Sequence, residues 1–262
     1  MAYIIADVNE KGGVGKTSTA TTKAYLLAKK GFKVLLIDFD GQAHSTLING
    51  INPNNLEVSM STLMSSIILE QSLPQNYIYE NDNGVHIIPA NSDLFLLERN
   101  LCNVNFREGK LAELVAHFKD KYDYIIIDCM PQMGISMVNA LMCADEVIIP
   151  TQTELLSVQG LGSLINHIKS IKKMNSSLKI GGILITMYDK QTILSSHIIE
   201  SLNNAYGNEV NIFSARIPRS IKVAEACLYG KTICEYLPSN KAAIAYEEFV
   251  NELLNLHKNM GV

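Results

Sequence analysis

The chain has 262 residues, of which 47% are hydrophobic and 18% are charged, and its net charge is −4 at pH 7. This composition indicates a globular protein with a sizeable core and excludes a disordered chain. No apolar run approaches the roughly 18 residues that a membrane-spanning helix requires. The negative charge gives no global attraction to nucleic acid, so DNA binding would require a local basic patch.

The cysteines and the N-terminus indicate a reducing compartment. Five cysteines, odd in number and scattered, form no Cys-x-x-Cys pair, which predicts reduced thiols and argues against a zinc ribbon or an iron–sulfur site. The first residues lead directly into an apolar run at 3–8, without the basic region and cleavage site of a secretory signal. We therefore expect a soluble, cytoplasmic protein with one domain over residues 1–262.

Short apolar runs alternate with longer helical patterns along the chain. The expected strands are residues 3–8, 34–37, 85–88, 124–127, 147–149 and 183–186. The expected helices are residues 16–30, 92–101, 107–121, 136–143, 157–174, 193–206 and 243–257, with loops at 49–55 and 74–84. Because the strand runs are nearly continuous in apolar residues, they indicate burial on both faces. The sequence thus predicts a doubly wound α/β fold, with a mainly parallel sheet and helices on both faces.

A glycine-rich segment lies between the first expected strand and the first expected helix. Residues 11–18 read Lys11, Gly12, Gly13, Val14, Gly15, Lys16, Thr17 and Ser18. In this context the motif predicts a phosphate-binding loop, because glycines let backbone N–H groups face phosphates and the helix N-terminus adds a favourable dipole. Lys16 would neutralise phosphate oxygens, and the Thr17 hydroxyl would hold Mg²⁺. The expected ligand is a nucleoside triphosphate.

The loop departs from the ordinary P-loop spacing, which places a glycine where Glu10 stands and requires no lysine at position 11. The form Lys-Gly-Gly-x-Gly-Lys-Thr resembles the deviant Walker A motif of the ParA/MinD ATPases. That resemblance implies a P-loop ATPase that uses ATP and Mg²⁺ and forms a homodimer when ATP is bound. It also implies that Lys11 reaches the nucleotide of the partner subunit and stabilises transition-state charge, much as an arginine finger does.

Asp38 and Asp40 follow the expected strand at 34–37, beside the place of the phosphate loop in a doubly wound sheet. This segment resembles switch I of the ParA proteins. By that resemblance Asp40 orients or activates the attacking water, and Asp38 supports the metal and the loop. Gly41 replaces the proline that usually follows, which implies a more mobile loop.

The expected strand at 124–127 ends in Asp128, the arrangement that holds Mg²⁺ or its waters. It resembles switch II of the same family, with Met130 in place of a proline and Gly134 as a pivot. Cys129 has no paired base in the sequence pattern, so we interpret it as a small buried spacer rather than a nucleophile. The expected metal ligands are Thr17, Asp38, Asp40 and Asp128.

The resemblance continues through four later segments, residues 147–150, 157–161, 186–189 and 217–219. In the family the last two lie near the adenine end of the site. This implies that Met187 and Pro218 flank the base, so the choice of adenine over guanine rests on the resemblance.

Partitioning ParA proteins bind DNA without sequence preference, through basic residues in the C-terminal half that contact phosphates. The corresponding candidates here are Lys190, Arg219 and Lys222. Gln191 stands where close relatives commonly carry arginine, which removes one phosphate contact. With ten residues before Lys11, the chain resembles the small Soj-like form without an N-terminal DNA-binding domain, whose activator is a ParB-like protein.

Two alternatives stay open. A MinD-like ATPase ends in an amphipathic membrane-targeting helix, but the polar face of the expected helix at 243–257 carries three glutamates, whereas membrane-binding helices are rich in Lys and Arg. We expect that helix to pack on the protein's own core and expect no membrane partner. A metabolic ATPase similar to nitrogenase reductase or to cobyrinate-amidating enzymes would share the early lysine.

The favoured function is an ATP-dependent dimeric switch for partitioning a plasmid, an integrated element or a chromosome. Such a switch hydrolyses ATP slowly, binds nonspecific DNA while ATP is bound, and is reset by a ParB-like partner. The expected location is the cytoplasm, with nucleoid association in the ATP-bound state.

Overall fold

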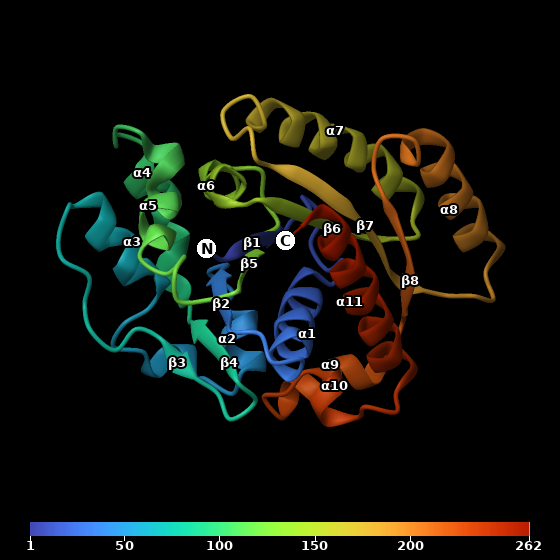
Figure 1. Cartoon of the computed structure of the whole chain (residues 1–262), viewed down its shortest axis with the longest axis horizontal. Helices are drawn as coiled ribbons and strands as arrows, with labels where there is room; N and C mark the ends of the chain where they lie inside the picture. The colour runs from blue at the N-terminus through green and yellow to red at the C-terminus, as the bar shows by residue number, and fades with distance from the viewer. Residues whose placement is uncertain (262) are drawn as a thin grey trace.

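A computed structural model describes residues 1–261, including every side chain except those of residues 155–159. The strands form one sheet in the order β3-β4-β2-β5-β1-β6-β7-β8 (Figure 1), and all neighbouring pairs are parallel except β3 and β4. Their bounds are β1 (Tyr3–Asp7), β2 (Val34–Phe39), β3 (Tyr79–Glu80), β4 (Val85–Ile88), β5 (Tyr124–Cys129), β6 (Glu146–Gln152), β7 (Lys179–Tyr188) and β8 (Ile212–Pro218). This sheet confirms the predicted fold class.

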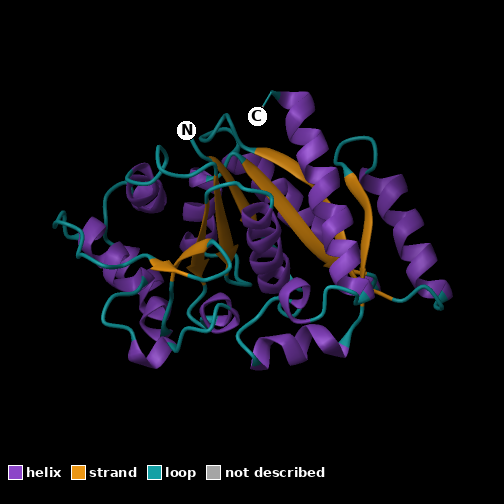
Figure 2. Ribbon diagram, turned by 60° about the horizontal axis from the view of Figure 1, so that its bottom comes forward, coloured by secondary structure: helices purple, strands orange, loops and turns teal. Residues whose placement is uncertain are grey.

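Helices cover both faces of the sheet (Figure 2). The α-helices are α1 (Lys16–Lys29), α2 (His44–Ile48), α3 (Met60–Ile68), α4 (Leu97–Leu101), α5 (Lys110–Ala116), α6 (Ile135–Cys143), α7 (Leu155–Ile171), α8 (Ile193–Tyr206), α9 (Ile221–Leu228), α10 (Ile233–Tyr236) and α11 (Lys241–Met260). Three 3₁₀ turns accompany them, η1 (Pro53–Asn55), η2 (Ser92–Leu96) and η3 (Arg107–Gly109).

Successive residues of the central strands enter separate apolar clusters on the two faces. Along β5, Ile125 and Ile127 pack in the cluster that α3, α5, α6 and α7 cover, while Tyr124 and Ile126 pack in the cluster under α1, α10 and α11. Residues of opposite orientation are therefore equally buried. This explains why the strands read as continuous apolar runs rather than as an alternating pattern.

The structure corrects several of the expected elements. The strands β3 and β8 were not expected, and β3 lies inside a segment predicted to be a loop. β8 is an edge strand in which Ser214 and Arg216 interrupt the apolar pattern. The expected helices at 92–101 and 107–121 each begin as a 3₁₀ turn, and α5 already ends at Ala116. The four helices α2, α3, α9 and α10 were also missed; each has nine residues or fewer, too few for a clear helical period.

The C-terminal helix α11 packs on the core, as predicted. Tyr246, Phe249 and Leu253 are at most 2% exposed. On its polar side, the Glu252 carboxylate accepts hydrogen bonds from the backbone N–H and the hydroxyl of Ser214 in β8. Within residues 1–261, no helix combines the length and the apolar character needed to cross a lipid bilayer.

A buried ion pair joins α1 to the central strand β1. Lys23 Nζ lies 2.7 Å from Asp7 Oδ2, and both side chains are fully buried. Two charges in the core are stable only when they are paired at close distance, so this contact fixes how α1 sits on the sheet. The helix that follows the glycine-rich loop is thereby held in one position on β1.

Candidate nucleotide site

The carboxyl ends of three neighbouring strands gather polar groups at one edge of the sheet. Asp128 at the end of β5 is the register neighbour of both Asp7 in β1 and Asp38 in β2. All three carboxylates are at most 1% exposed. The loop between β1 and α1 leaves the sheet at this edge, which is where ligands bind in open α/β sheets.

The glycine-rich loop has the backbone geometry that phosphate binding requires. Gly13 and Gly15 have φ angles of 74° and 86°, in the left-handed region that side chains rarely adopt. Gly15 is the N-cap of α1, and none of the described side chains caps this end of the helix. The first N–H groups of α1 are therefore available to an anion, and the helix dipole favours one there.

Side chains from β6 and β7 form hydrogen bonds with the backbone of this loop. Thr186 Oγ1 donates to the carbonyl oxygen of Val14 at 2.8 Å, and Gln152 Nε2 donates to that of Gly13 at 2.7 Å. Gln152 also contacts the sulfur of Met187. Both carbonyls are thereby held toward the sheet, so the loop is supported by the ends of two further strands.

Lys16 lies in the first turn of α1 with only 6% of its surface exposed. Its Nζ donates to the carbonyl oxygen of Lys11 at 3.0 Å, so the side chain folds back along the loop. Burial lowers the pKa of the Lys16 ammonium, and the charges of Asp128 and Asp40 act against that shift. A phosphate at the loop would add negative charge beside this ammonium and favour its charged form.

Asp38 and Asp128 are held by the start of α2. Asp38 Oδ2 accepts hydrogen bonds from the N–H and the hydroxyl of Thr46, at 2.8 and 2.7 Å. Asp128 Oδ2 accepts one from the Ser45 hydroxyl at 2.8 Å. Burial raises the pKa of the Asp38 carboxyl to about 7, and the hydrogen bonds from Thr46 oppose that rise. Burial also raises the pKa of the Asp128 carboxyl, to about 8; repulsion from Asp38 adds to this rise, and hydrogen bonds from Ser45 and Thr17 oppose it.

A divalent cation fits this end of the site. Asp128 Oδ1 is buried and has no hydrogen-bond partner among the described residues, so one oxygen lone pair is left for a ligand. A cation would also offset the cost of two buried carboxylates. No three His, Cys, Asp or Glu side chains in the described chain lie close enough to form a metal cage on their own. Mg²⁺ in nucleotide sites takes most of its ligands from water and phosphate, so the oxygen donors present match its chemistry.

Asp40 lies at the start of the loop after β2 and is 7% exposed. Its Oδ1 accepts the N–H of Gln42 at 2.9 Å, and its own N–H approaches Asp38 Oδ1 at 3.3 Å. Gly41, the next residue, is buried, and its α-carbon faces the ring of Phe95.

Lys11 forms an ion pair within its own chain. Its ammonium lies 2.5 Å from Glu154 Oε2, directly before α7, and the two side chains are 37% and 52% exposed. The pair is accessible to solvent, so it is individually weak. Any movement of Lys11 toward a second subunit would have to break this contact.

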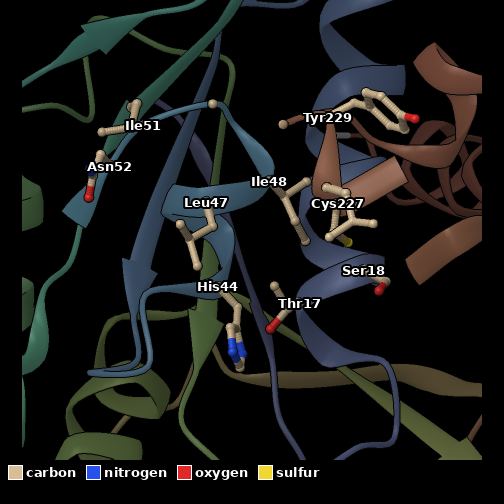
Figure 3. Close-up of a pocket in the computed structure, with 12 residues that line it drawn as sticks. Thr17, Ser18, His44, Leu47, Ile48, Ile51, Asn52, Cys227 and Tyr229 are labelled. Carbon is tan, nitrogen blue, oxygen red and sulfur yellow. The ribbon is translucent and has the colours of Figure 1, made fainter. Parts of the chain in front are cut away.

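Two cavities flank the first turn of α1. One, of about 290 Å³, is lined by Gly15, Ser18, Met187 and Pro218, so the two residues expected at the base share one pocket with the phosphate loop. Met187 has a φ of 49°, a strained value for a side chain other than glycine. The other cavity, of about 910 Å³, lies on the side of α2 and α9; Figure 3 shows its lining, including Thr17, His44, Cys227 and Tyr229.

The three residues predicted to contact DNA are all exposed. Lys190 follows β7 and Arg219 follows β8, and the Arg219 N–H donates to the carbonyl oxygen of Tyr188 at 3.2 Å, which brings the two strand ends together. Lys222 Nζ pairs with Glu225 at 2.6 Å, so its charge is partly satisfied. The basic patch is therefore weaker than a count of lysines and arginines indicates.

Sequence reasoning missed several residues that shape the site. Gln152, Thr186 and Glu154 hold the phosphate loop or Lys11, and Ser45 and Thr46 hold the carboxylates. Gln152 and Glu154 could have been found, because they are polar residues that closely follow the apolar strand at 147–149.

The fold and this edge of the sheet define a P-loop nucleotide-binding protein. A family model described as an AAA domain matches residues 2–180. The chain is 35% identical to the sporulation initiation inhibitor protein Soj of Bacillus subtilis, covering 97% of this chain and 98% of that protein. It is 32% identical to the chromosome partitioning protein ParA of Myxococcus xanthus, covering 96% and 87%. The chain therefore belongs to the Soj/ParA family of ATPases.

A solved structure adds a further similarity. The crystal structure titled cobyrinic acid a,c-diamide synthase from Mycobacterium smegmatis, with bound ADP and magnesium, superposes with a TM-score of 0.85 at 32% identity. The match covers 100% of this chain and 97% of that one. Its fold therefore follows this chain over the whole length.

Proposed function

We propose that this protein is an ATP- and Mg²⁺-dependent dimeric switch that hydrolyses ATP slowly and binds nonspecific DNA while ATP is bound. In this proposal a ParB-like partner stimulates hydrolysis and resets the switch, which serves to partition a plasmid, an integrated element or a chromosome. One observation carries the proposal: a lysine, Lys11, opens a phosphate loop of otherwise ordinary geometry in a chain that matches Soj along its length. We further propose that residues 1–262 act as one domain in the cytoplasm, associated with the nucleoid when ATP is bound.

ATP would bind with its phosphates over residues 12–16 and its base between Met187 and Pro218. The free N–H groups of α1 and the Lys16 ammonium match the charge of the phosphates. Thr17 and Asp128, supported by Asp38, would hold Mg²⁺ or its waters, and the metal would offset charge on the transferring phosphoryl group. The magnesium and ADP named for the M. smegmatis structure support this choice of ligands.

For hydrolysis, Asp40 would orient the attacking water, since its charge acts on Lys16 in the phosphate loop and one of its oxygens accepts the N–H of Gln42. Lys11 would leave Glu154 and contact the ATP of the partner subunit, adding positive charge where negative charge develops. Hydrolysis would then require two subunits, so the rate of hydrolysis would set the lifetime of the ATP-bound dimer.

DNA would contact Lys190, Arg219 and Lys222 on the dimer. Each monomer offers few such groups, and Lys222 is already paired with Glu225, so the affinity would be low per subunit and strongly dependent on salt. Dimerisation doubles the number of contacts. Release of DNA would therefore follow the return to monomers.

The test compares the native protein with Lys16→Ala, Lys11→Ala and Asp40→Ala, measuring ATP turnover, ATP-dependent dimerisation by sedimentation, and DNA retention at low salt. We expect Lys16→Ala to lose nucleotide binding or dimerisation, and Asp40→Ala to stay on DNA as an ATP-bound dimer. Lys173→Ala, an exposed lysine after α7, is the matched control for charge. Native protein that remains monomeric with ATP and ignores DNA would refute the proposal, and native turnover by Lys11→Ala would remove its role in the partner's site.

The similarity to the M. smegmatis structure favours one second candidate, an ATPase that activates a carboxylate for amide formation. ATP turnover that rises with cobyrinic acid and an ammonia source, and not with DNA, would select that candidate. Turnover that rises with DNA and a ParB-like protein would exclude it.

A further inference from the structure

A short segment between β4 and α5 lies against two loops beside the nucleotide site, one that begins with Asp40 and one that follows Asp128 and the end of β5. This bracing segment, residues 92–101, consists of η2 and α4. Leu94, Leu97 and Leu101 are at most 3% exposed and anchor it in the core. Their spacing of three and four residues fixes which way the segment faces. Its other side chains are thereby held at fixed places beside the nucleotide site.

Phe95 of the bracing segment packs on the first carboxylate loop, residues 40–43. A β-carbon built on Gly41 would lie 2.9 Å from three carbons of the Phe95 ring, well inside the 3.5 to 4.0 Å of an ordinary carbon contact. Half of the Phe95 side chain is exposed, so its buried half is the one that covers this loop. The absence of a side chain at Gly41, directly after Asp40, is what allows the ring to lie there.

Glu98 makes the same kind of contact with the loop at residues 130–134, which follows Asp128 and β5 and is called here the second carboxylate loop. A β-carbon built on Gly134 would lie 2.7 Å from the carboxyl carbon of Glu98, so the carboxylate occupies the space of a side chain. Glu98 Oε1 is buried and has no hydrogen-bond partner among the described residues, and the same is true of the hydroxyl of Ser136. Gly134 is the N-cap of α6, and no side chain within the described part of the chain caps that helix. The Glu98 carboxylate, a hydrogen-bond acceptor, therefore lies near the uncapped N–H donors of the first turn of α6.

We propose that Phe95 and Glu98 are positioning residues for ATP hydrolysis, an inference that rests on the proposed function. The bracing segment contacts one loop through Gly41 and the other through Gly134, and it thereby sets the distance between Asp40 and the magnesium end at Asp128. When nucleotide moves either loop, the segment must move with it and carry the change to the other. Neither residue lines either of the two cavities beside the first turn of α1.

The first experiment measures steady-state ATP hydrolysis for Phe95→Ala, Glu98→Ala and Glu98→Gln. A misplaced loop lowers turnover rather than binding, so we expect kcat to fall about tenfold for Phe95→Ala and Glu98→Ala, with KM for ATP within about twofold of native. Glu98→Gln keeps the shape and an acceptor, and it should recover most of the loss. Leu96→Ala is the matched control, because Leu96 is 46% exposed on the same segment and faces neither glycine.

The second experiment tests contact between the two partners. Gly41→Ala places a methyl group against the Phe95 ring and should lower kcat by itself. In the double variant with Phe95→Ala the collision is gone, so its loss of kcat should be no larger than that of Phe95→Ala alone. Losses that multiply would show that the two positions act independently and would overturn the inference.

A third measurement does not depend on turnover. With Mg²⁺ and a non-hydrolysable ATP analogue, hydrogen exchange should slow together in the bracing segment and in both carboxylate loops of the native protein. In Phe95→Ala the first loop should lose this protection while the phosphate loop keeps it. Equal protection in native protein and both alanine variants, or native kcat in both, would overturn the inference. A native protein that binds the analogue but never hydrolyses ATP would refute the proposed function alone. Hydrogen exchange would still test whether the bracing segment couples the two loops.

Discussion

The buried pair of Lys23 and Asp7 gives a prediction about stability that can be worked from the structure. Both side chains are fully buried and their charged atoms lie 2.7 Å apart. Replacing Lys23 by Met keeps most of the side-chain volume but leaves the Asp7 carboxylate unpaired in the core. Breaking a buried pair in this way typically costs about 3–5 kcal/mol, a large share of the stability of a protein domain.

Replacing both partners should have a much smaller effect. Asp7→Val with Lys23→Met removes both charges and fills the space with apolar groups, a change that is often neutral or stabilising by about 1–4 kcal/mol. Asp7 Oδ1 is buried and has no hydrogen-bond partner among the residues that the structure describes, which favours the stabilising end of this range. The double variant is therefore both the control for folding and the test of the charge argument.

The pH dependence of the single variant follows from the same pair. Burial raises the pKa of the Asp7 carboxyl, and Lys23 counteracts that rise. Without Lys23 the pKa rises further, so the folded variant keeps a proton that the unfolded chain has lost, and its free energy of unfolding falls as pH increases. The deficit relative to native should be largest at about pH 8 and should shrink toward about pH 5.

The assay is urea unfolding without nucleotide, followed by far-ultraviolet circular dichroism, since the chain has no tryptophan. A Lys23→Met variant within about 1 kcal/mol of native, or a deficit that grows as pH falls, would refute this account of the pair.

Other predictions concern the site and the thiols. Glu154→Gln weakens the ion pair that holds Lys11 in its own chain, so ATP-dependent dimerisation measured by sedimentation should strengthen severalfold. Weaker dimerisation would contradict the idea that this ion pair restrains Lys11. Because the pKa values of Asp38 and Asp128 are raised and Mg²⁺ requires carboxylates, calorimetry should find Mg²⁺–nucleotide binding tighter as pH rises from about 6 to about 8, whereas a flat profile would count against this metal site. Iodoacetamide should modify exposed Cys102 first, while burial raises the pKa of the Cys129 thiol and protects it; rapid labelling of Cys129 by mass spectrometry would contradict its role as a spacer.

The parts of the site that the sequence predicts are those with a local signal. Glycines before Lys16 and Thr17 can be read from the chain because the turn itself demands them, and Asp38 and Asp128 stand out because each ends an apolar strand. The sheet could be predicted for the same reason, since its central strands are buried on both faces.

The contacts that hold the site come from distant segments, and no local pattern specifies them. Thr186 supports the phosphate loop across 172 positions of sequence, and Gln152 does so across 139. No local pattern pairs Asp7 with Lys23, since only the packing of α1 on β1 brings them together. The edge strand β8 was missed because its buried residues alternate with polar ones, so it lacks the continuous apolar run by which the central strands were predicted.

The attachment of the phosphate loop to β6 and β7 has a consequence for nucleotide choice. Gln152 touches both the loop, at Gly13, and Met187, which lines the smaller cavity, while the neighbouring Thr186 holds Val14. A base that fits poorly and displaces Met187 would pull on the same side chain that secures the loop. Selectivity for the base would then be expressed as a change in the affinity of the loop for the phosphates. A mismatch at the base end of the nucleotide would weaken binding at the phosphate end.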